Sequence, residues 1–468
     1  MAKIVVAGAG ICGMAAGIML ARDGHEVTVV ERDPDPAPDT GEEAWTDWNR
    51  QGISQFRMGH VLLARGRHIL ARRIPDALDR MLELGALEVP MLPPSTLESW
   101  TPRDDDAANP MLGIRRPVID KAMADTAAAV DGLTVRRGVA LSGLMIADDP
   151  AAEIPHVTGV ESEDGERFPA DLVVDAMGRR SPMLRWLAAV GAPAAYEEAV
   201  DSGFAYYGQY FHSSQGLPNA AWGLTPFDGF SILALPGDSN TWFIGAYASS
   251  NDKELRILRD RETLHDLLRA CPLHAPFVDG DALGDVISMV GVTDRDRRFV
   301  VNGSPVVTGM VPVADAWACT NPSLGRGMSI GLMHVELLAE FLSNPPEDAA
   351  ELVRQWDEIT HATMRPWHDA TRSVDQARAA ELDAQRQGRQ LEPDPADVGA
   401  AIRGAIAAAL PYDENVYRLF WRVFQIVDFP ETVFGDPENL QMLIDAAEGR
   451  EPHVVPGPTR AEFLASRA

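Results

Sequence analysis

The chain has little lysine and no long apolar run. Lysine occurs only as Lys3, Lys121 and Lys253, so most of its 41 basic residues are arginine, and 69 acidic residues bring the formal charge to −28. Nucleic acid and anionic membrane surfaces would repel so acidic a protein, and we expect neither as a partner. No run of about 18 apolar residues is present, and we expect no membrane span.

Cysteine is also scarce. Cys12, Cys271 and Cys319 are odd in number and far apart, with no CxxC pair and no Cys/His spacing suited to a metal. This usage is typical of a reducing compartment. Only Lys3 precedes the apolar N-terminus, and glycines interrupt it, unlike a secretion signal. We therefore expect a cytoplasmic protein without a bound metal.

The first 31 residues contain the clearest motif. An apolar run at 4–6 meets Gly8-Ala9-Gly10-Ile11-Cys12-Gly13, a helical pattern follows, and a second apolar run ends at Glu31. Gly8 permits a tight turn, Gly10 lets the backbone approach a pyrophosphate, and Gly13 lets the helix pack close to the strand. Glu31 is placed to accept hydrogen bonds from a ribose. The order predicts a dinucleotide site, but this stretch alone does not distinguish NAD from FAD.

Two later segments end buried strands with an acid and a glycine turn. In the first, the apolar run 172–174 leads into Asp175 and Gly178. In the second, an apolar strand leads to Asp315, a turn from Pro322 to Gly327, and an apolar helix over 328–341. Open α/β sheets bind ligands at such strand ends. Gln55, Arg57 and His60 crowd in front of a helical pattern at 61–70, where polar cofactor contacts are also expected.

A chain of 468 residues is too long for one core, so we expect several domains. Aromatic segments with near-alternating spacing over 203–248 predict antiparallel strands, and helical patterns dominate 346–468. The predicted fold is α/β. A Rossmann-like cofactor domain (1–73, 113–200 and 290–345) is interleaved with a mixed or antiparallel-sheet substrate domain (74–112 and 201–289), and a helical domain (346–468) follows.

Together, Gly8 to Glu31, Asp175 to Ser181 and Asp315 to Gly327 resemble the three FAD motifs of flavoprotein monooxygenases with the p-hydroxybenzoate hydroxylase fold. The Gln55–His60 stretch and the Asp175 motif look most like the branch of bacterial polyether epoxidases and squalene-epoxidase-like enzymes. One position departs from the family, which usually has glycine before the third motif's acid, where this chain has Ala314.

The resemblance implies roles for particular residues. Those expected to bind FAD are Gly8, Gly10, Gly13, Glu31, Arg32, Gln55, Arg115, Asp175, Gly178, Asp315, Pro322, Gly325 and Gly327. Arg57, His60 and Pro322 are expected near the flavin as catalytic residues. Tyr206, Tyr210, Trp222 and Phe230 are the expected substrate contacts.

The resemblance also implies the chemistry. Reduced FAD and O₂ would form a C4a-hydroperoxide that gives one oxygen atom to a largely apolar, natural-product-like substrate, by epoxidation or hydroxylation. The reductant would be NADPH or reduced flavin from a separate flavin reductase, and the protein a monomer or homodimer. The alternatives are a reductase or oxidase on the same fold, a halogenase, and a flavin-binding protein without turnover. A halogenase would need a positioned lysine, and none of the three lysines lies in a tryptophan-rich motif.

Overall fold

The computed structural model describes residues 1–53, 55–91, 97, 100–149, 153–220, 222–391 and 396–467. Within them, five parallel strands form the central sheet, in the order β20-β10-β1-β2-β6. These strands are β1 (Lys3–Ala7), β2 (Glu26–Val30), β6 (Leu133–Arg136), β10 (Leu172–Asp175) and β20 (Met310–Pro312). A parallel sheet is covered on both faces, so its inner strands are buried: residues 4–7 of β1 and all four residues of β10 are buried.

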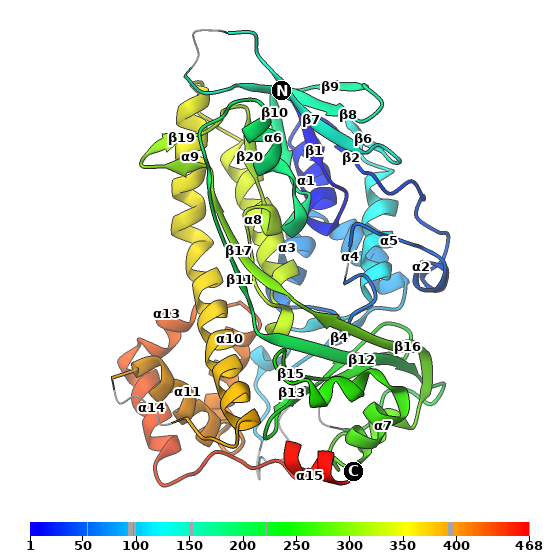
Figure 1. The fold of residues 1–468 in the computed structure, drawn as a ribbon, viewed down its shortest axis with the longest axis vertical. Coiled ribbons are helices and arrows are strands. Elements are labelled where there is room, and N and C mark those ends of the chain that lie inside the picture. The colour runs from blue at the N-terminus through cyan, green and yellow to red at the C-terminus, as the bar shows by residue number, and fades with distance from the viewer. Residues whose placement is uncertain are drawn as a thin grey trace.

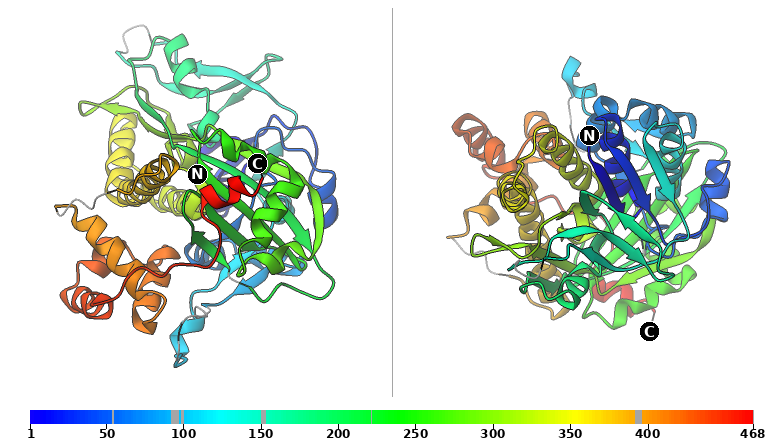
Figure 2. Two further views of the ribbon diagram at one scale, coloured as in Figure 1. Left: turned by 60° about the horizontal axis from the view of Figure 1, so that its bottom comes forward. Right: turned by 90° about the horizontal axis from the view of Figure 1, so that it is seen from above.

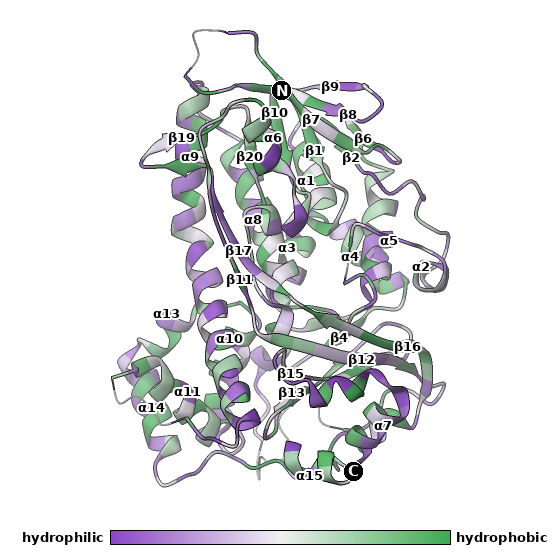
Figure 3. Ribbon diagram, in the orientation of Figure 1, coloured by the Kyte–Doolittle hydropathy of each residue, from purple (hydrophilic) through white to green (hydrophobic). Residues whose placement is uncertain are grey.

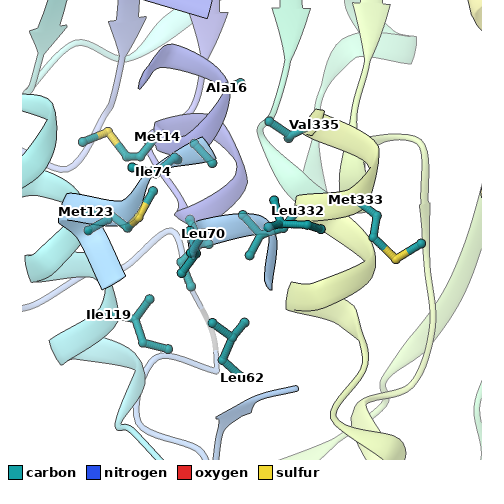
Figure 4. Packing of buried hydrophobic residues seen from close by; sticks show 14 of the residues in the cluster. Met14, Ala16, Leu62, Leu70, Ile74, Ile119, Met123, Leu332, Met333 and Val335 are labelled. Carbon is teal, nitrogen blue, oxygen red and sulfur yellow. The ribbon is translucent and has the colours of Figure 1, made fainter. Parts of the chain in front are cut away.

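Five helices surround the core beside this sheet: α1 (Ile11–Arg22), α3 (Ala64–Arg73), α4 (Pro75–Glu83), α5 (Arg116–Ala127) and α8 (Gly327–Phe341). Figure 4 shows Met14, Leu70, Ile119 and Leu332 converging between α1, α3, α5 and α8. Helix α4 packs into this core through buried residues such as Met81. The proposed domain limits stay a prediction.

The helix expected over 61–70 begins later. Val61–Leu62 forms strand β3, which pairs with β5 (Met111–Gly113), and the helix α3 starts at Ala64. Pairing with a distant strand overrides the local helical pattern here. β4 (Leu87–Val89) completes this small sheet, and β7 (Leu141–Ile146), β8 (Val157–Ser162) and β9 (Arg167–Pro169) form another.

An antiparallel sheet forms the second domain, in the order β13-β14-β15-β12-β16. Its strands are β12 (Phe204–His212), β13 (Gly223–Pro226), β14 (Ser231–Pro236), β15 (Thr241–Ser249) and β16 (Asp281–Val290). The antiparallel strands expected over 203–248 are therefore confirmed. A ribbon of β11 (Tyr196–Asp201) and β17 (Thr293–Arg298) joins the two domains (Figure 1). Figure 3 shows that this ribbon is hydrophilic.

The C-terminal region is helical, as expected. Its helices are α9 (Ala349–Thr363), α10 (Arg365–Arg386), α11 (Val398–Ala409), α12 (Glu414–Phe424), α13 (Pro430–Phe434), α14 (Pro437–Ala447) and α15 (Arg460–Ala465). Helix α10 lies below α9 and extends from the β11–β17 ribbon toward the antiparallel sheet (Figure 1). Arg365 pairs with Asp296 of β17 at 2.6 Å, and Arg378 donates to the Phe230 carbonyl at 2.9 Å. Helices α11 to α14 form a lobe beside α10 (Figure 2).

The remaining described elements are short connections. They are α2 (Gly41–Thr46), α6 (Met183–Ala189), α7 (Arg261–Arg269), β18 (Val300–Val301), β19 (Ser304–Pro305), β21 (Ala318–Cys319), η1 (Asp104–Ala107), η2 (Gly178–Arg180), η3 (Glu254–Arg259), η4 (Ala275–Val278), η5 (Ala314–Ala316) and η6 (Pro322–Leu324). No helix among the described residues is long and apolar enough to cross a bilayer.

Candidate functional site

A cavity of about 2640 Å³ connects the three strand-end motifs with the antiparallel sheet and the C-terminal helices. Ordinary ligand pockets measure roughly 300–1,000 Å³, so this space is large enough for a dinucleotide and a second molecule. Its walls include Gly8, Asp315, Pro322, Tyr206 and Phe420, which come from widely separated parts of the sequence. The motifs that looked independent in the sequence thus share one site.

The first glycine turn lies at one end of this cavity, between β1 and α1. Gly8 has a φ of +100°, and a Cβ there would stand 2.8 Å from the Ala176 carbonyl oxygen. A Cβ at Gly13 would lie 1.9 Å from the Gly8 oxygen, so Gly13 serves the packing of α1 and is not among the described lining residues. No described side chain caps α1 at Gly10, which lines the cavity. An uncapped helix N-terminus facing a cavity is suited to a pyrophosphate.

Glu31, at the end of β2, lines the cavity within a set of hydrogen-bond donors. Its carboxylate accepts the Ala9 and Asp33 N–H groups, each at 3.0 Å, and the Arg50 guanidinium at 2.7 Å. A carboxylate has about four acceptor positions, which leaves room for a ribose hydroxyl. No sequence motif singled out Arg50, which is buried and also pairs with Asp120 at 3.3 Å. Arg32 and Gln55 line the same cavity.

The arginine beside the glycine turn is Arg116 rather than Arg115. Arg115 is buried and donates to Asp238 at 2.7 Å and Glu42 at 3.2 Å, and it is not among the described residues that line the cavity. Arg116 lines the cavity, and a Cβ on Gly10 would be 3.9 Å from its Nη2. Successive residues at a helix start point about 100° apart, and the sequence pattern does not identify which of the two faces the ligand.

In the second motif, a buried acid holds the turn that follows β10. Asp175 is fully buried and accepts the Met177 N–H at 3.0 Å and the Ser181 hydroxyl at 2.5 Å. Burial raises the pKa of Asp175 to about 6. Asp175 is outside the described lining, whereas Met177, Gly178 and Arg179 form part of it. We infer that Asp175 shapes the turn rather than contacting the cofactor.

The third motif brings an acid and a helix end to the cavity. Asp315 lines it, and desolvation raises the pKa of that carboxyl despite the nearby charges of Arg179, Arg116 and Arg297. Ala314, where glycine is usual in the resembling family, has a φ of +51°. Its N–H donates to His334 Nδ1 at 3.0 Å, which fixes this strained backbone.

Pro322, Gly325 and Gly327 line the cavity where η6 leads into α8. Gly325 closes η6 in the left-handed region, with a φ of +63°. No described side chain caps α8 at Arg326, so a second helix N-terminus lies at the cavity wall. Its partial positive charge would favour negative charge on a bound group.

His60 and Arg57 lie in different surroundings. His60 lines the cavity and its Nδ1 is 2.8 Å from the Met58 carbonyl, an acceptor, so Nδ1 carries the proton and Nε2 is free to accept. Burial, helped by Arg116, lowers the pKa of His60 to about 4, and the ring is neutral at pH 7. Arg57 instead donates to the Trp48 carbonyl at 3.0 Å and stacks on Trp45, outside the described lining.

Of the expected substrate contacts, Tyr206 and Trp222 line the cavity. Tyr210 packs against Trp45 and donates to the Met58 carbonyl at 3.2 Å, and Phe230 stacks on Phe227 in a core behind the sheet. Neither is among the described lining residues. Sequence reasoning missed the contribution of the C-terminal helices, which includes Asp375.

Comparisons with known proteins agree with this geometry. Residues 1–202 match the family described as FAD binding domain. Protein Rv3254 of Mycobacterium tuberculosis is 27% identical over 387 residues, which cover 76% of this chain and 77% of that protein. The chain thus carries an FAD binding domain, and its cofactor is FAD.

Two solved structures have the same overall fold. PqsL, a probable FAD-dependent monooxygenase from Pseudomonas aeruginosa, aligns with a TM-score of 0.59 at 15% identity, over 82% of this chain and 98% of that one. The Diels-Alderase PyrE3 aligns with a TM-score of 0.58 at 16% identity, over 91% of this chain and 80% of that one. The protein is a flavoprotein with the fold of the FAD-dependent monooxygenases, as predicted, whereas the epoxidase branch stays a prediction.

Proposed function

We propose that the protein is an FAD-dependent monooxygenase that transfers one oxygen atom from O₂ to a largely apolar substrate, by epoxidation or hydroxylation. The continuous cavity supports this proposal, because the Pro322–Gly325 turn and Tyr206 border the same space as the Gly8 turn. A cofactor held at the glycine end would share that space with a substrate held against the antiparallel sheet. Substrate and cofactor must be held together for oxygen transfer.

The residues fit FAD on three counts. A Cβ would fill the cradle at Gly8, Glu31 retains acceptor positions at the end of β2, and the N-terminus of α1 meets the cavity uncapped. In this proposal Gly8 and Gly10 hold the pyrophosphate, Glu31 the ribose, and Arg116 balances the phosphate charge. Asp315 orients the middle of the cofactor, and the N-terminus of α8 stabilises negative charge on the reduced ring.

Reduced FAD would supply the two electrons with which O₂ is cleaved, one oxygen atom going to the substrate and the other leaving as water. The protein's part is to place the substrate and to exclude water. Apolar walls on α11 and α12, which include Ile402, Ile406 and Phe420, suit that task. Neutral His60 offers Nε2 as a hydrogen-bond acceptor at the cavity wall.

The decisive experiment uses ¹⁸O₂. The purified protein is supplied with NADPH, or with reduced FAD from an added flavin reductase, and with a panel of apolar alkenes and phenols. Mass spectrometry is expected to find products containing one ¹⁸O atom, and the two supplies reveal the reductant. Substrate reduction without O₂ would identify the alternative reductase, and product oxygen drawn from H₂¹⁸O would contradict the proposal.

The same assay distinguishes two other classes of protein. A flavin-binding protein without turnover would consume neither reductant under any supply. A cycloaddition catalyst with this fold, as PyrE3 is named, would convert its substrate without O₂ or reductant. Cytoplasmic location, the flavin reductase partner and the monomeric or homodimeric state stay predictions.

A further inference from the structure

Helix α10 contributes an acid to the cavity wall that the FAD motifs do not require. Asp375 is 2% exposed and lines the cavity at η6, where the Ser323 hydroxyl donates to its Oδ1. Its Oδ2 is buried and has no hydrogen-bond partner among the described residues. A buried carboxylate oxygen without a donor is costly, so a donor from a ligand would relieve this penalty.

A second unsatisfied group adjoins Asp375. Asn321 is also 2% exposed and lines the cavity, and its Oδ1 accepts the Tyr206 hydroxyl at 2.8 Å. That bond assigns Nδ2 as the donor end of the amide. Nδ2 is buried and has no partner of good hydrogen-bond geometry among the described residues, although Asn321 is close enough to Asp375 to lower the pKa of that carboxyl. One wall of the cavity therefore presents an acceptor on Asp375 and a donor on Asn321.

The groups around Asp375 offset its burial only in part. Burial raises the pKa of Asp375 to about 7, and Asp294 adds to the effect, whereas hydrogen bonding from Ser323 and Asn321 and the positive charge of Arg326 lower it. Arg326 instead donates to the Thr371 hydroxyl and to the Val423 carbonyl, each at 3.4 Å. The lining contributed by α11 and α12 is mainly apolar, with Ile402, Ile406 and Phe420 among its residues. Such a wall would hold a molecule with one hydroxyl group and an apolar body.

We propose that Asp375 and Asn321 form a hydroxyl-recognition site, in which a substrate hydroxyl donates to Asp375 Oδ2 and accepts from Asn321 Nδ2. The inference rests on the proposed function only in taking this ligand to be the molecule that is oxygenated. Asp375 thereby selects hydroxyl-bearing substrates and positions them beside the Pro322–Gly325 turn. Asp375 and Asn321 both lie outside residues 1–202, the part of the chain that matches the FAD binding domain.

The test compares 1-naphthol with its methyl ether, 1-methoxynaphthalene, which has the same ring but no donor. Each is titrated calorimetrically into the oxidised FAD-loaded protein at about pH 8, where the Asp375 carboxyl is mostly ionised. Hydrogen bonds to charged groups contribute roughly 1.5–3 kcal/mol, so the wild type should bind naphthol about 10-fold tighter or more. Asp375→Asn should reduce this ratio to about 2-fold or less, with the flavin content unchanged.

Asp383→Asn is the matched control, because Asp383 lies on α10 outside the described cavity lining and should leave the ratio intact. Asp375→Ser is a second variant that removes the carboxylate in case the amide variant does not fold. A wild type that binds both probes equally or neither, or an Asp375 variant that keeps the preference, would overturn the inference.

This experiment separates the two proposals. Binding is measured without reductant, so a failure of oxygenation leaves its result unaffected. Conversely, equal oxygenation of naphthol and its ether by the wild type would support monooxygenation and contradict hydroxyl recognition.

Discussion

Ala314→Gly should stabilise the protein, although most substitutions in a buried turn do the opposite. Ala314 begins η5 with a φ of +51°, in the left-handed region. An L-residue pays roughly 1–2 kcal/mol for this conformation, and a glycine pays nothing. Two costs oppose this gain. The greater freedom of glycine in the unfolded chain costs about 0.4–1 kcal/mol, and the lost methyl group removes part of the free energy that its burial contributes. The net expectation is a stabilisation of about 0.5 kcal/mol.

Ala316→Gly is the matched control in the same turn. Ala316 is fully buried and has no positive φ, so glycine brings only costs there. The backbone term is about 0.5–1 kcal/mol and the lost methyl about 0.8 kcal/mol, which together destabilise by about 1.5 kcal/mol. The two variants should therefore differ by about 2 kcal/mol, with opposite signs relative to the wild type.

The measurement is urea unfolding of the FAD-loaded protein. Flavin fluorescence reports release of the cofactor, and the fluorescence of the ten tryptophans reports unfolding of the chain as a whole. Equal slopes are required before midpoints are compared. If Ala314→Gly lowered the midpoint as much as Ala316→Gly does, the left-handed strain assigned to this turn would be refuted.

Three further predictions concern single positions. Arg116→Met should weaken FAD binding by about 10-fold or more in calorimetry. Arg115→Met should instead chiefly lower the melting temperature of the apoprotein, because Asp238 is left buried without its partner. The reverse pattern would contradict the assignment of Arg116, rather than Arg115, to the cofactor. Gly8→Ala should purify with little flavin, because the added Cβ meets the Ala176 carbonyl. Gly24 also has a positive φ, +91°, but no atom lies within 4 Å of an added Cβ, so Gly24→Ala should keep the flavin-to-protein absorbance ratio of the wild type. Equal losses of flavin from the two variants would refute the steric argument. Burial raises the pKa of Asp375 from 3.8 to about 7, so the folded state binds one more proton than the unfolded state between these pH values. As pH rises from 4 to 7, the free energy of unfolding of the wild type should fall by up to about 1.4 kcal/mol per pH unit relative to Asp375→Asn. If urea titrations show no change in this difference across that range, the raised pKa of Asp375 is wrong.

Local signals explain what the sequence predicted well. The strand, glycine turn and helix around Gly8 and Gly13 are encoded within a few residues, and alternation marked the strands near Tyr206. The same alternation places neighbouring side chains on opposite faces, and it does not reveal which face meets the cavity. Tyr206 therefore lines the cavity, whereas Phe230 is buried behind the sheet.

Long-range contacts explain what was missed. The choice between Arg115 and Arg116 depends on the rotation of α5 against its neighbours, which short-range pattern does not set. Asp375 reaches Ser323 because α10 packs against the η6 turn, an arrangement decided by tertiary packing rather than by a motif. The sequence pattern predicted helices over 346–468, but it did not predict that these helices contribute to the cavity wall.

The order of the central sheet has a consequence for synthesis on the ribosome. Strand β10 is flanked by β1 on one edge and by β20 on the other, and Val173 pairs with Met310. As the nascent chain emerges, that second edge stays open until residue 312 of 468 has left the exit tunnel. An open strand edge is a site of wrong pairing between growing chains. A gene fragment ending at residue 202 would therefore leave β10, which is buried throughout in the full-length protein, as an exposed edge strand of the sheet.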